Sequence, residues 1–428
     1  MIFLFFLGID LFQNVEVESS MVDGKTVEYL PIASVTQEGP YEFFIPQDEI
    51  CFFNLNQTRL VGSFQILHKD DTKIKNITDD TANITANAED AKISICNMLP
   101  ATLFRQVEVY LNSTQVQDIT SPCYPWKHHM ETLLSYSKEC KDTFLRCEMY
   151  EENETKRKEL IKNSKICNFS IKPSIDVFNS QKFLGPNVSL KLRFLRSDKS
   201  FGIIKNTSTN DYYIKIISLK LQMRKIMPTT FTKDQFYKRL ALKEAQMAFN
   251  SAKIRTYQIA KGQTNHTLSN VCNGTLPKHI MIAMVDAGAF SGVDFTDPLK
   301  YENFKLNKVN ILINGQNHLP SPLEADFETE ENLIELYRHL TDNTGILHGN
   351  HSNGITYDQF KTNSSIIAFD LNPDRCLHYH NHMTTKGSIS LELGFKSATT
   401  NNIVVLVYMT FQSGLKFNNL QQVIKSDA

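Results

Sequence analysis

One pattern of strand and turn occurs twice in this sequence, and it constrains the fold more than any other feature. The dipeptide Asn112-Ser113 follows one strand-like segment, and Asn314-Gly315 follows another one, 202 positions later. Asn-Gly between apolar runs is the strongest short hairpin signal. A second matching pair, residues 188–194 and residues 389–395, keeps an offset of 201. The chain is therefore predicted to contain two similar units of about 200 residues each.

Most of the remaining strong segments are typical of β-strands. They alternate in polarity or are dense in β-branched and aromatic residues, as at 27–32, 41–45, 103–111, 214–223 and 403–411. We predict an all-β fold of two tandem eight-stranded jelly-roll β-sandwiches, with short helices in loops and a helical connector. Two four-stranded sheets folded together in this way leave few open sheet edges.

Three segments have a helical period, in which the apolar residues share one face. The first contains Trp126, Met130, Leu133 and Leu134, the second Phe236, Leu240 and Met247, and the third Leu333, Leu336, Tyr337 and Leu340. Thr232 is a plausible N-cap for the second helix, and Glu328, Glu330 and Glu331 would form an acidic first turn for the third.

These patterns divide the chain into five parts. We expect an N-terminal arm at 1–24, a first jelly roll at 25–228, a connecting helix at 229–250, a second jelly roll at 251–413 and a C-terminal tail at 414–428. The polar stretches 69–90 and 151–165 are expected to be surface excursions.

The charge balance excludes some classes of partner. The chain has 45 basic and 46 acidic residues, which gives a formal net charge of −1. We therefore expect no specific nucleic-acid partner and no attraction to anionic membranes. No apolar run reaches the ~18 residues of a membrane-spanning helix, so a polytopic membrane protein is excluded.

The cysteines favour an intracellular, reducing location, whereas the sequons favour secretion. None of the eight cysteines forms a CxxC pair, which favours buried free thiols in a reducing compartment over a zinc ribbon or a redox site. Twelve Asn-X-Ser/Thr sequons stand against about five expected by chance for 35 Asn residues. Together with the apolar run at 2–7, they leave open a secreted glycan- or receptor-binding β-sandwich protein.

No motif in the sequence requires catalysis. HExxH, P-loop, GxSxG and GxGxxG patterns are absent. His378, His380 and His382 would face one side of a strand and could then bind Zn²⁺, but their Asn, Pro and Thr neighbours favour a loop. Trp126 with Tyr124 could form a sugar-binding platform, although core packing is the better interpretation. We expect no catalytic residues, no metal and no cofactor, and hence not an enzyme.

Several motifs, taken in order, resemble one known family. They lie at 103–112, 124–125, 131–136, 163–165, 192–197, 326–327 and 368–371. In this order they resemble the double jelly-roll major capsid protein of Polinton (Maverick) elements and adintoviruses, over about residues 9–411. The sequence departs from the family at 126–129, where the family prefers Tyr-Arg-Ala-Tyr, and at Gly62, which interrupts a segment expected to be more aromatic.

The resemblance implies a structural role. Each subunit would carry two jelly rolls, and three subunits would form a homotrimer of near-hexagonal outline. Such capsomers would tile an icosahedral shell through contacts with neighbouring capsomers and with a minor capsid (penton) protein, without a chemical reaction. The resemblance places the protein in the virion capsid, after assembly in the host cytoplasm or nucleus. A domesticated capsid-derived host protein is a further alternative.

Overall fold

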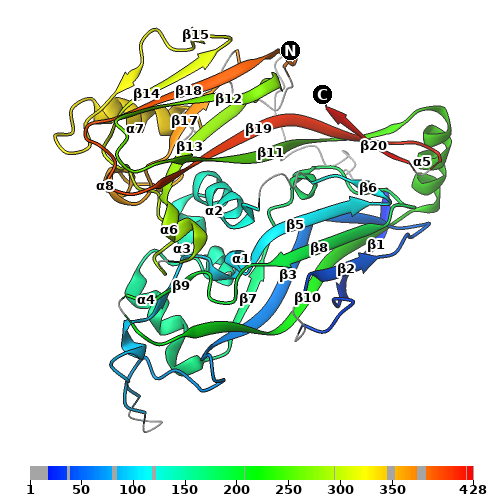
Figure 1. Ribbon diagram of the computed structural model, residues 1–428. Helices are drawn as coiled ribbons and strands as arrows, with labels where there is room; N and C mark the ends of the chain where they lie inside the picture. The colour runs from blue at the N-terminus through cyan, green and yellow to red at the C-terminus, as the bar shows by residue number, and fades with distance from the viewer. Residues whose placement is uncertain are drawn as a thin grey trace, which may run out of the picture.

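Two β-sandwiches follow one another along the chain (Figure 1). The computed structural model describes residues 18–35, 39–79, 84–117, 122–206, 208–293, 295–344, 352–373, 382–420 and 422–427. Within these ranges the all-β prediction is confirmed, because antiparallel sheets dominate and the helices are short.

Two four-stranded sheets form the first sandwich. One sheet has the order β1 (Met21–Tyr29), β10 (Tyr212–Pro228), β3 (Phe52–His68) and β7 (Cys167–Ile171). The other has the order β2 (Tyr41–Ile45), β8 (Leu190–Arg196), β5 (Phe104–Leu111) and β6 (Thr114–Gln115). A separate small sheet pairs β4 (Ser94–Ile95) with β9 (Ile203–Ile204).

The second sandwich repeats this strand order. One sheet has the order β11 (Ala245–Ile259), β19 (Ile403–Phe417), β13 (His279–Asp286) and β17 (Ile367–Asp370), and β20 (Val423–Asp427) pairs with β19. The other has the order β12 (Asn265–Thr275), β18 (Lys386–Phe395), β14 (Leu306–Ile313) and β15 (Gln316–Asn317), and β16 (Leu323–Glu324) pairs with β14. In both units the first main strand lies beside the last one, which is the jelly-roll arrangement.

The repeated turn predicted from the sequence is present in both units. Asn112 joins β5 to β6 with φ 52°, and Asn314 joins β14 to β15 with φ 54°. The Oδ1 atom of Asn112 accepts a hydrogen bond from the backbone N–H of Ser189 at 2.8 Å, and that of Asn314 accepts one from Ser388 at 2.9 Å. The same side chain therefore fixes the same turn against the neighbouring strand, β8 or β18, in each unit.

Short helices fill the connections between strands. They are α1 (Leu99–Thr102), α2 (Tyr124–Ser135), α3 (Lys138–Asp142), α4 (Glu154–Leu160), α5 (Thr230–Leu242), α6 (Ala287–Ser291), α7 (Leu333–Asp342) and α8 (Tyr357–Thr362). The 3₁₀ turns are η2 (Asp90–Lys92), η3 (Phe144–Glu148), η4 (Lys162–Ser164) and η5 (Asp176–Asn179). No helix among the described residues is long and apolar enough to cross a membrane.

The connecting helix is shorter than predicted. Helix α5 ends at Leu242, and Lys243 is extended with φ −153° and ψ 154°. Met247, assigned to the helix from its spacing, lies in β11, where Met247 and Phe249 are buried and their neighbours are exposed. This alternation has the period of a strand, so it outweighed the weaker helical spacing. The N-cap is Thr229, whose hydroxyl accepts from the backbone of Thr232, rather than Thr232 itself.

Other predicted boundaries also shift. Helix α7 begins at Leu333, so the acidic residues 328–331 lie before it, and only Glu335 occupies its first turn. The expected C-terminal tail is ordered as a strand, because β20 pairs with the end of β19. The polar stretches are only partly exposed, since Ile74 lies in the core and Arg157 of α4 is buried.

The two sandwiches share one apolar core. Buried side chains from both sandwiches form a single connected cluster. Helix α2, which Figure 1 shows between the sandwiches, contributes Trp126 to it. The Trp126 ring stacks on Phe290 with 4.2 Å between centroids, and its Nε1 donates to the carbonyl of Pro298 at 2.8 Å. Core packing of Trp126 is therefore confirmed, and the ring is not available as a sugar-binding platform.

Candidate functional site

Helix α2 carries charged side chains into the junction between the two jelly rolls. Pro125 lies in its first turn, where the missing N–H costs no hydrogen bond. Most of the helix is buried, including Lys127, His128 and His129. Charged groups are rarely fully buried unless they are paired, so the partners of these three residues define how the two units are held together.

Lys127 is the centre of a buried polar group that joins the two units. Its Nζ donates to Asp176 Oδ1 at 2.6 Å and to the carbonyl of Ser174 at 3.0 Å, and it lies 3.5 Å from Glu131 Oε1. The other oxygen of Asp176 accepts from the backbone N–H of Ala252 in β11 at 3.1 Å. This arrangement links the first unit to the second through a single carboxylate.

Glu131 makes the second link across the junction. Its Oε1 accepts from the hydroxyl of Tyr408 in β19 at 3.0 Å, and its Oε2 accepts from the hydroxyl of Ser174. Burial raises the pKa of Glu131, with Lys127 opposing the rise. Burial lowers the pKa of Lys127, but the carboxylates of Asp176 and Glu131 more than compensate and leave it raised. The amine therefore stays charged inside the junction.

The two adjacent histidines serve different contacts, as expected for neighbours on a helix. His129 Nδ1 lies 3.0 Å from the hydroxyl of Tyr301 in the second unit. Burial, together with the nearby cations, lowers the pKa of His129 to about 3, so the ring is neutral. His128 Nε2 lies 3.4 Å from Glu148, which Arg59 also contacts at 3.1 Å, but the contact of His128 does not have the geometry of a hydrogen bond.

A cavity of about 730 Å³, lined by both polar and apolar side chains, lies beside this junction. Both units contribute to its wall: His128, Glu148 and Lys172 come from the first unit, and Asn250 and Gln412 come from the second. Arg157 of α4 lies 3.5 Å from Asp297, which adds a further contact between the units. These contacts hold the two sandwiches in one orientation relative to each other.

The predicted metal candidates are only partly within the described residues. His378 and His380 lie outside them, whereas His382 lies just inside. Among the residues whose placement is described, no group of three or more His, Cys, Asp or Glu side chains could hold a metal ion.

The cysteines in the described ranges are free thiols. Burial raises the pKa of Cys123 to about 12 and that of Cys167 to about 11, so both stay protonated and unreactive. Cys147 is exposed and Cys140 is half-buried, so the prediction of buried thiols does not extend to all of them.

The sequon asparagine Asn76 is buried. Asn76 is 5% exposed, its amide donates to the carbonyl of Lys158 at 3.2 Å, and its Oδ1 accepts from the backbone of Asn163 at 2.8 Å. A glycan at this position would break both contacts. The excess of sequons is therefore partly the use of Asn in loop structure.

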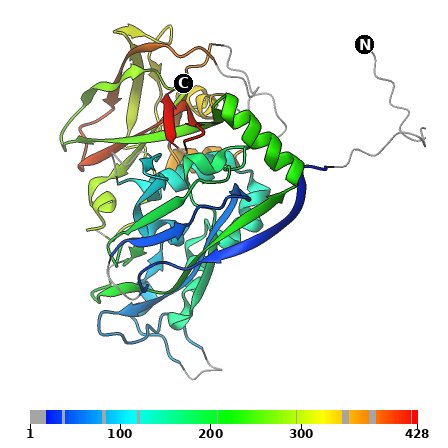
Figure 2. The same cartoon turned by 90° about the vertical axis from the view of Figure 1, so that its right-hand side faces the viewer.

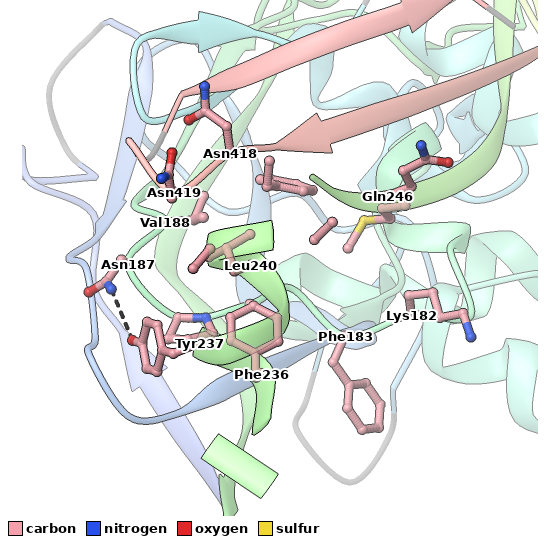
Figure 3. A pocket seen from close by; sticks show the side chains of 16 residues that line it. Lys182, Phe183, Asn187, Val188, Phe236, Tyr237, Leu240, Gln246, Asn418 and Asn419 are labelled. Carbon is pink, nitrogen blue, oxygen red and sulfur yellow. Dashed lines mark hydrogen bonds between the residues drawn. The ribbon is translucent and has the colours of Figure 1, made fainter. Parts of the chain in front are cut away.

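An apolar groove lies on the surface beside helix α5 (Figure 3). It has a volume of about 280 Å³, and its wall includes Phe236, Leu240, Val188, Met247 and Phe417. Lys182 is its only charged lining residue among those described. The hydroxyl of Tyr237 accepts from the amide of Asn187 at 3.0 Å and donates to the carbonyl of Glu49 at 2.8 Å, which holds the helix against the first unit.

The sequence motifs did not reveal the junction. Lys127 lies in the segment 126–129, where the sequence departs from the family, and no motif includes Asp176 or Tyr408. One signal was present, because Lys127 and Glu131 are four positions apart on an otherwise apolar helix, the spacing at which opposite charges meet.

Strand order and core together define a double jelly-roll protein. No family model matches the chain. A Caenorhabditis elegans protein described as uncharacterized is 22% identical over 385 residues, which cover 87% of this chain and 90% of that protein.

Solved structures with the same fold are viral capsid proteins. PBCV-1 VP54, fitted into a reconstruction of the virophage Sputnik, matches with a TM-score of 0.61 and 12% identity, over 97% of this chain and 99% of its own. A Sputnik virophage chain matches with a TM-score of 0.65 and 10% identity, over 98% and 91%. The mavirus major capsid protein matches with a TM-score of 0.51 and 12% identity, over 98% and 92%. At these identities the likeness shows the fold, which is the double jelly roll of viral major capsid proteins.

Proposed function

We propose that this protein is a structural major capsid protein that assembles into homotrimeric, pseudo-hexameric capsomers of an icosahedral shell. The observation that carries the proposal is the pairing of two jelly rolls of identical strand order in one core. Full-length similarity to viral capsid structures supports it. No chemical step is part of the proposed role.

The fold provides the symmetry that such a capsomer requires. Three subunits with two similar units each present six similar blocks around one axis, which approximates a hexagon. This outline is regular only if the two units keep a constant relative orientation. The buried contacts of Lys127, Asp176, Glu131 and Tyr408 supply that constraint.

The proposed lineage and partners rest on the ordered sequence motifs. They resemble Polinton and adintovirus capsid proteins, and the nematode relative of nearly equal extent supports carriage in an animal genome. The partners would be further copies of this chain and a minor capsid (penton) protein. Assembly would take place in the host cell interior, and the mature location would be the virion capsid.

Mass measurement and microscopy of the purified full chain test this proposal. Light scattering after size exclusion is expected to give about three times the 49.0 kDa chain mass, and negative-stain images are expected to show hexagonal outlines or shells. A strictly monomeric protein at high concentration, without particles in expressing cells, would contradict the proposal. A matched variant, Asp176→Ala, should lose hexagonal particles while an exposed change, Lys220→Ala, should keep them.

Expression in secreting cells distinguishes a capsid protein from the alternative, a secreted glycan- or receptor-binding protein. A capsid protein is expected to remain in the cell without glycans, whereas a secreted product whose mobility shifts on deglycosylation would favour the alternative. The buried contacts of Asn76 predict that this sequon stays unmodified in either case.

A further inference from the structure

Helix α5 exposes large apolar side chains at both of its ends. None of its residues is buried, and Phe231 and Leu242 are 73% and 87% exposed. The groove on its inner side is lined by Phe236, Leu240 and Met247, with aromatic and aliphatic neighbours (Figure 3). Exposed apolar surfaces of this kind mark sites that another segment covers.

The described chain begins at the base of this helix. The backbone N–H of Thr229, the N-cap of α5, donates to the carbonyl of Ser20 at 2.9 Å, and Met21 pairs with Pro228. Figure 2 shows β1 meeting one end of α5 and the C-terminal hairpin of β19 and β20 beside the other end. The first described residues therefore lie at the N-terminal end of α5, and the C-terminal half of the same helix lines the groove.

Those residues include the most apolar segment of the sequence. Nine of the eleven residues at 2–12 are Ile, Leu or Phe, and no Lys or Arg occurs before Lys25. Asp10 is the charged residue of this segment, whereas the groove's charged residue among those described is Lys182; α5 itself carries exposed Lys238 and Arg239 and one exposed acidic residue, Asp234. Apolar surface and charge are thus complementary between the segment and the groove.

The distance along the chain allows the contact. Eight residues from Phe12 to Ser20 span up to about 26 Å when extended, whereas the 13-residue helix α5 is about 20 Å long. A segment tethered this closely has an effective concentration on the order of millimolar at its site. We propose that residues 2–12 of the chain dock intramolecularly into the groove beside α5.

Hydrogen exchange on the full chain and on a variant lacking residues 2–12 tests the proposal. The experiment uses dissociated subunits, so its result is independent of shell assembly. Backbone amides at 236–240, 183–188 and 417–419 are expected to exchange about tenfold faster in the shortened chain. Adding a synthetic peptide of residues 1–17 should restore their protection.

Two substitutions guard against a general loss of folding. Leu240 lines the groove, so Leu240→Glu should abolish the protection of the groove amides. The exchange rates of the β-strand amides should stay unchanged. Leu242→Glu, on the same helix but outside the groove lining, should keep the protection of the groove amides.

Three results would overturn the proposal. One is equal exchange of the groove amides in the full and shortened chains. Another is protection that rises with protein concentration, which would assign the groove to a second copy. The third is an intact mass showing that residues 2–12 are removed from the purified protein.

Discussion

Lys127 and Asp176 form a buried ion pair, with 2.6 Å between Nζ and Oδ1, at the point where the two jelly rolls meet. Both side chains are less than a tenth exposed, and the second oxygen of Asp176 accepts from Ala252 of the other unit. Asp176 therefore contacts α2 with one oxygen and the second jelly roll with the other, and this helps to fix the orientation of the two sandwiches.

Removal of one partner of this pair should destabilise the protein strongly. Lys127→Met leaves the Asp176 carboxylate buried without its cation, which typically costs about 3–5 kcal/mol. Adding Asp176→Leu should cost less than the sum of the two single changes, because no unpaired charge remains at that pair. Urea unfolding followed by the fluorescence of Trp126, the single tryptophan, measures each value. As a control, breaking the exposed Lys220–Glu28 pair should cost less than about 1 kcal/mol.

His129 should make the protein sensitive to mild acid. Its pKa is lowered to about 3 in the folded state, chiefly by burial, whereas an unfolded histidine titrates near 6.5. The unfolded state therefore binds the proton first, and the contribution of His129 to stability is complete above pH 6.5 and is lost as the pH falls toward 3. The free energy of unfolding should fall less steeply over this range in His129→Gln.

A second variant separates the two influences on His129. Tyr301→Phe removes the hydroxyl that contacts the ring but keeps the site buried. Because burial is the main cause of the lowered pKa, the acid sensitivity should persist in Tyr301→Phe. If this variant lost the pH dependence while His129→Gln kept it, the assignment would be wrong.

The two equivalent asparagine turns should respond alike to substitution. Asn112 and Asn314 both have positive φ and both accept from a serine N–H of the adjacent strand. Alanine at either position meets the left-handed backbone penalty of about 1–2 kcal/mol and loses the hydrogen bond. Glycine should be tolerated better, since it removes only the bond. Thermal unfolding of the four variants tests this equivalence, which a large effect at only one turn would contradict.

Gly62 should not tolerate a side chain. A Cβ there would lie 2.6 Å from the carbonyl oxygen of Ser218 and 2.7 Å from the ring of Phe169, within the sheet formed by β10, β3 and β7. Gly62→Ala is expected to cost about 1–3 kcal/mol through overpacking. Gly39→Ala is a matched control, because no atom of the described residues, its chain neighbours aside, lies within 4 Å of the added carbon. Equal midpoints for the two variants would show that the sheet adjusts without strain.

Local patterns of the sequence predicted most of the strands, turns and helices. The Asn turns at an offset of 202, the alternating strands and the apolar faces of α2 and α7 were readable because each depends on neighbours in the chain. The same local reading failed at Met247, where one residue matched both a helical and a strand period. Pairing of Met247 with Leu415 in β19, 168 positions away, decided that segment as a strand.

The junction was decided by the tertiary structure alone. Lys127, Asp176 and Tyr408 are distant in sequence, and nothing in their spacing indicates that they share one buried site. Likewise, Gly62 interrupts a strand pattern in the sequence. The close approach of Ser218 and Phe169 in the folded chain explains why glycine stands there. The sequence by itself determined which elements form and that they form twice. Only the folded chain decided which charges meet, because the energy of a buried charge depends on partners that the strand pairing brings together.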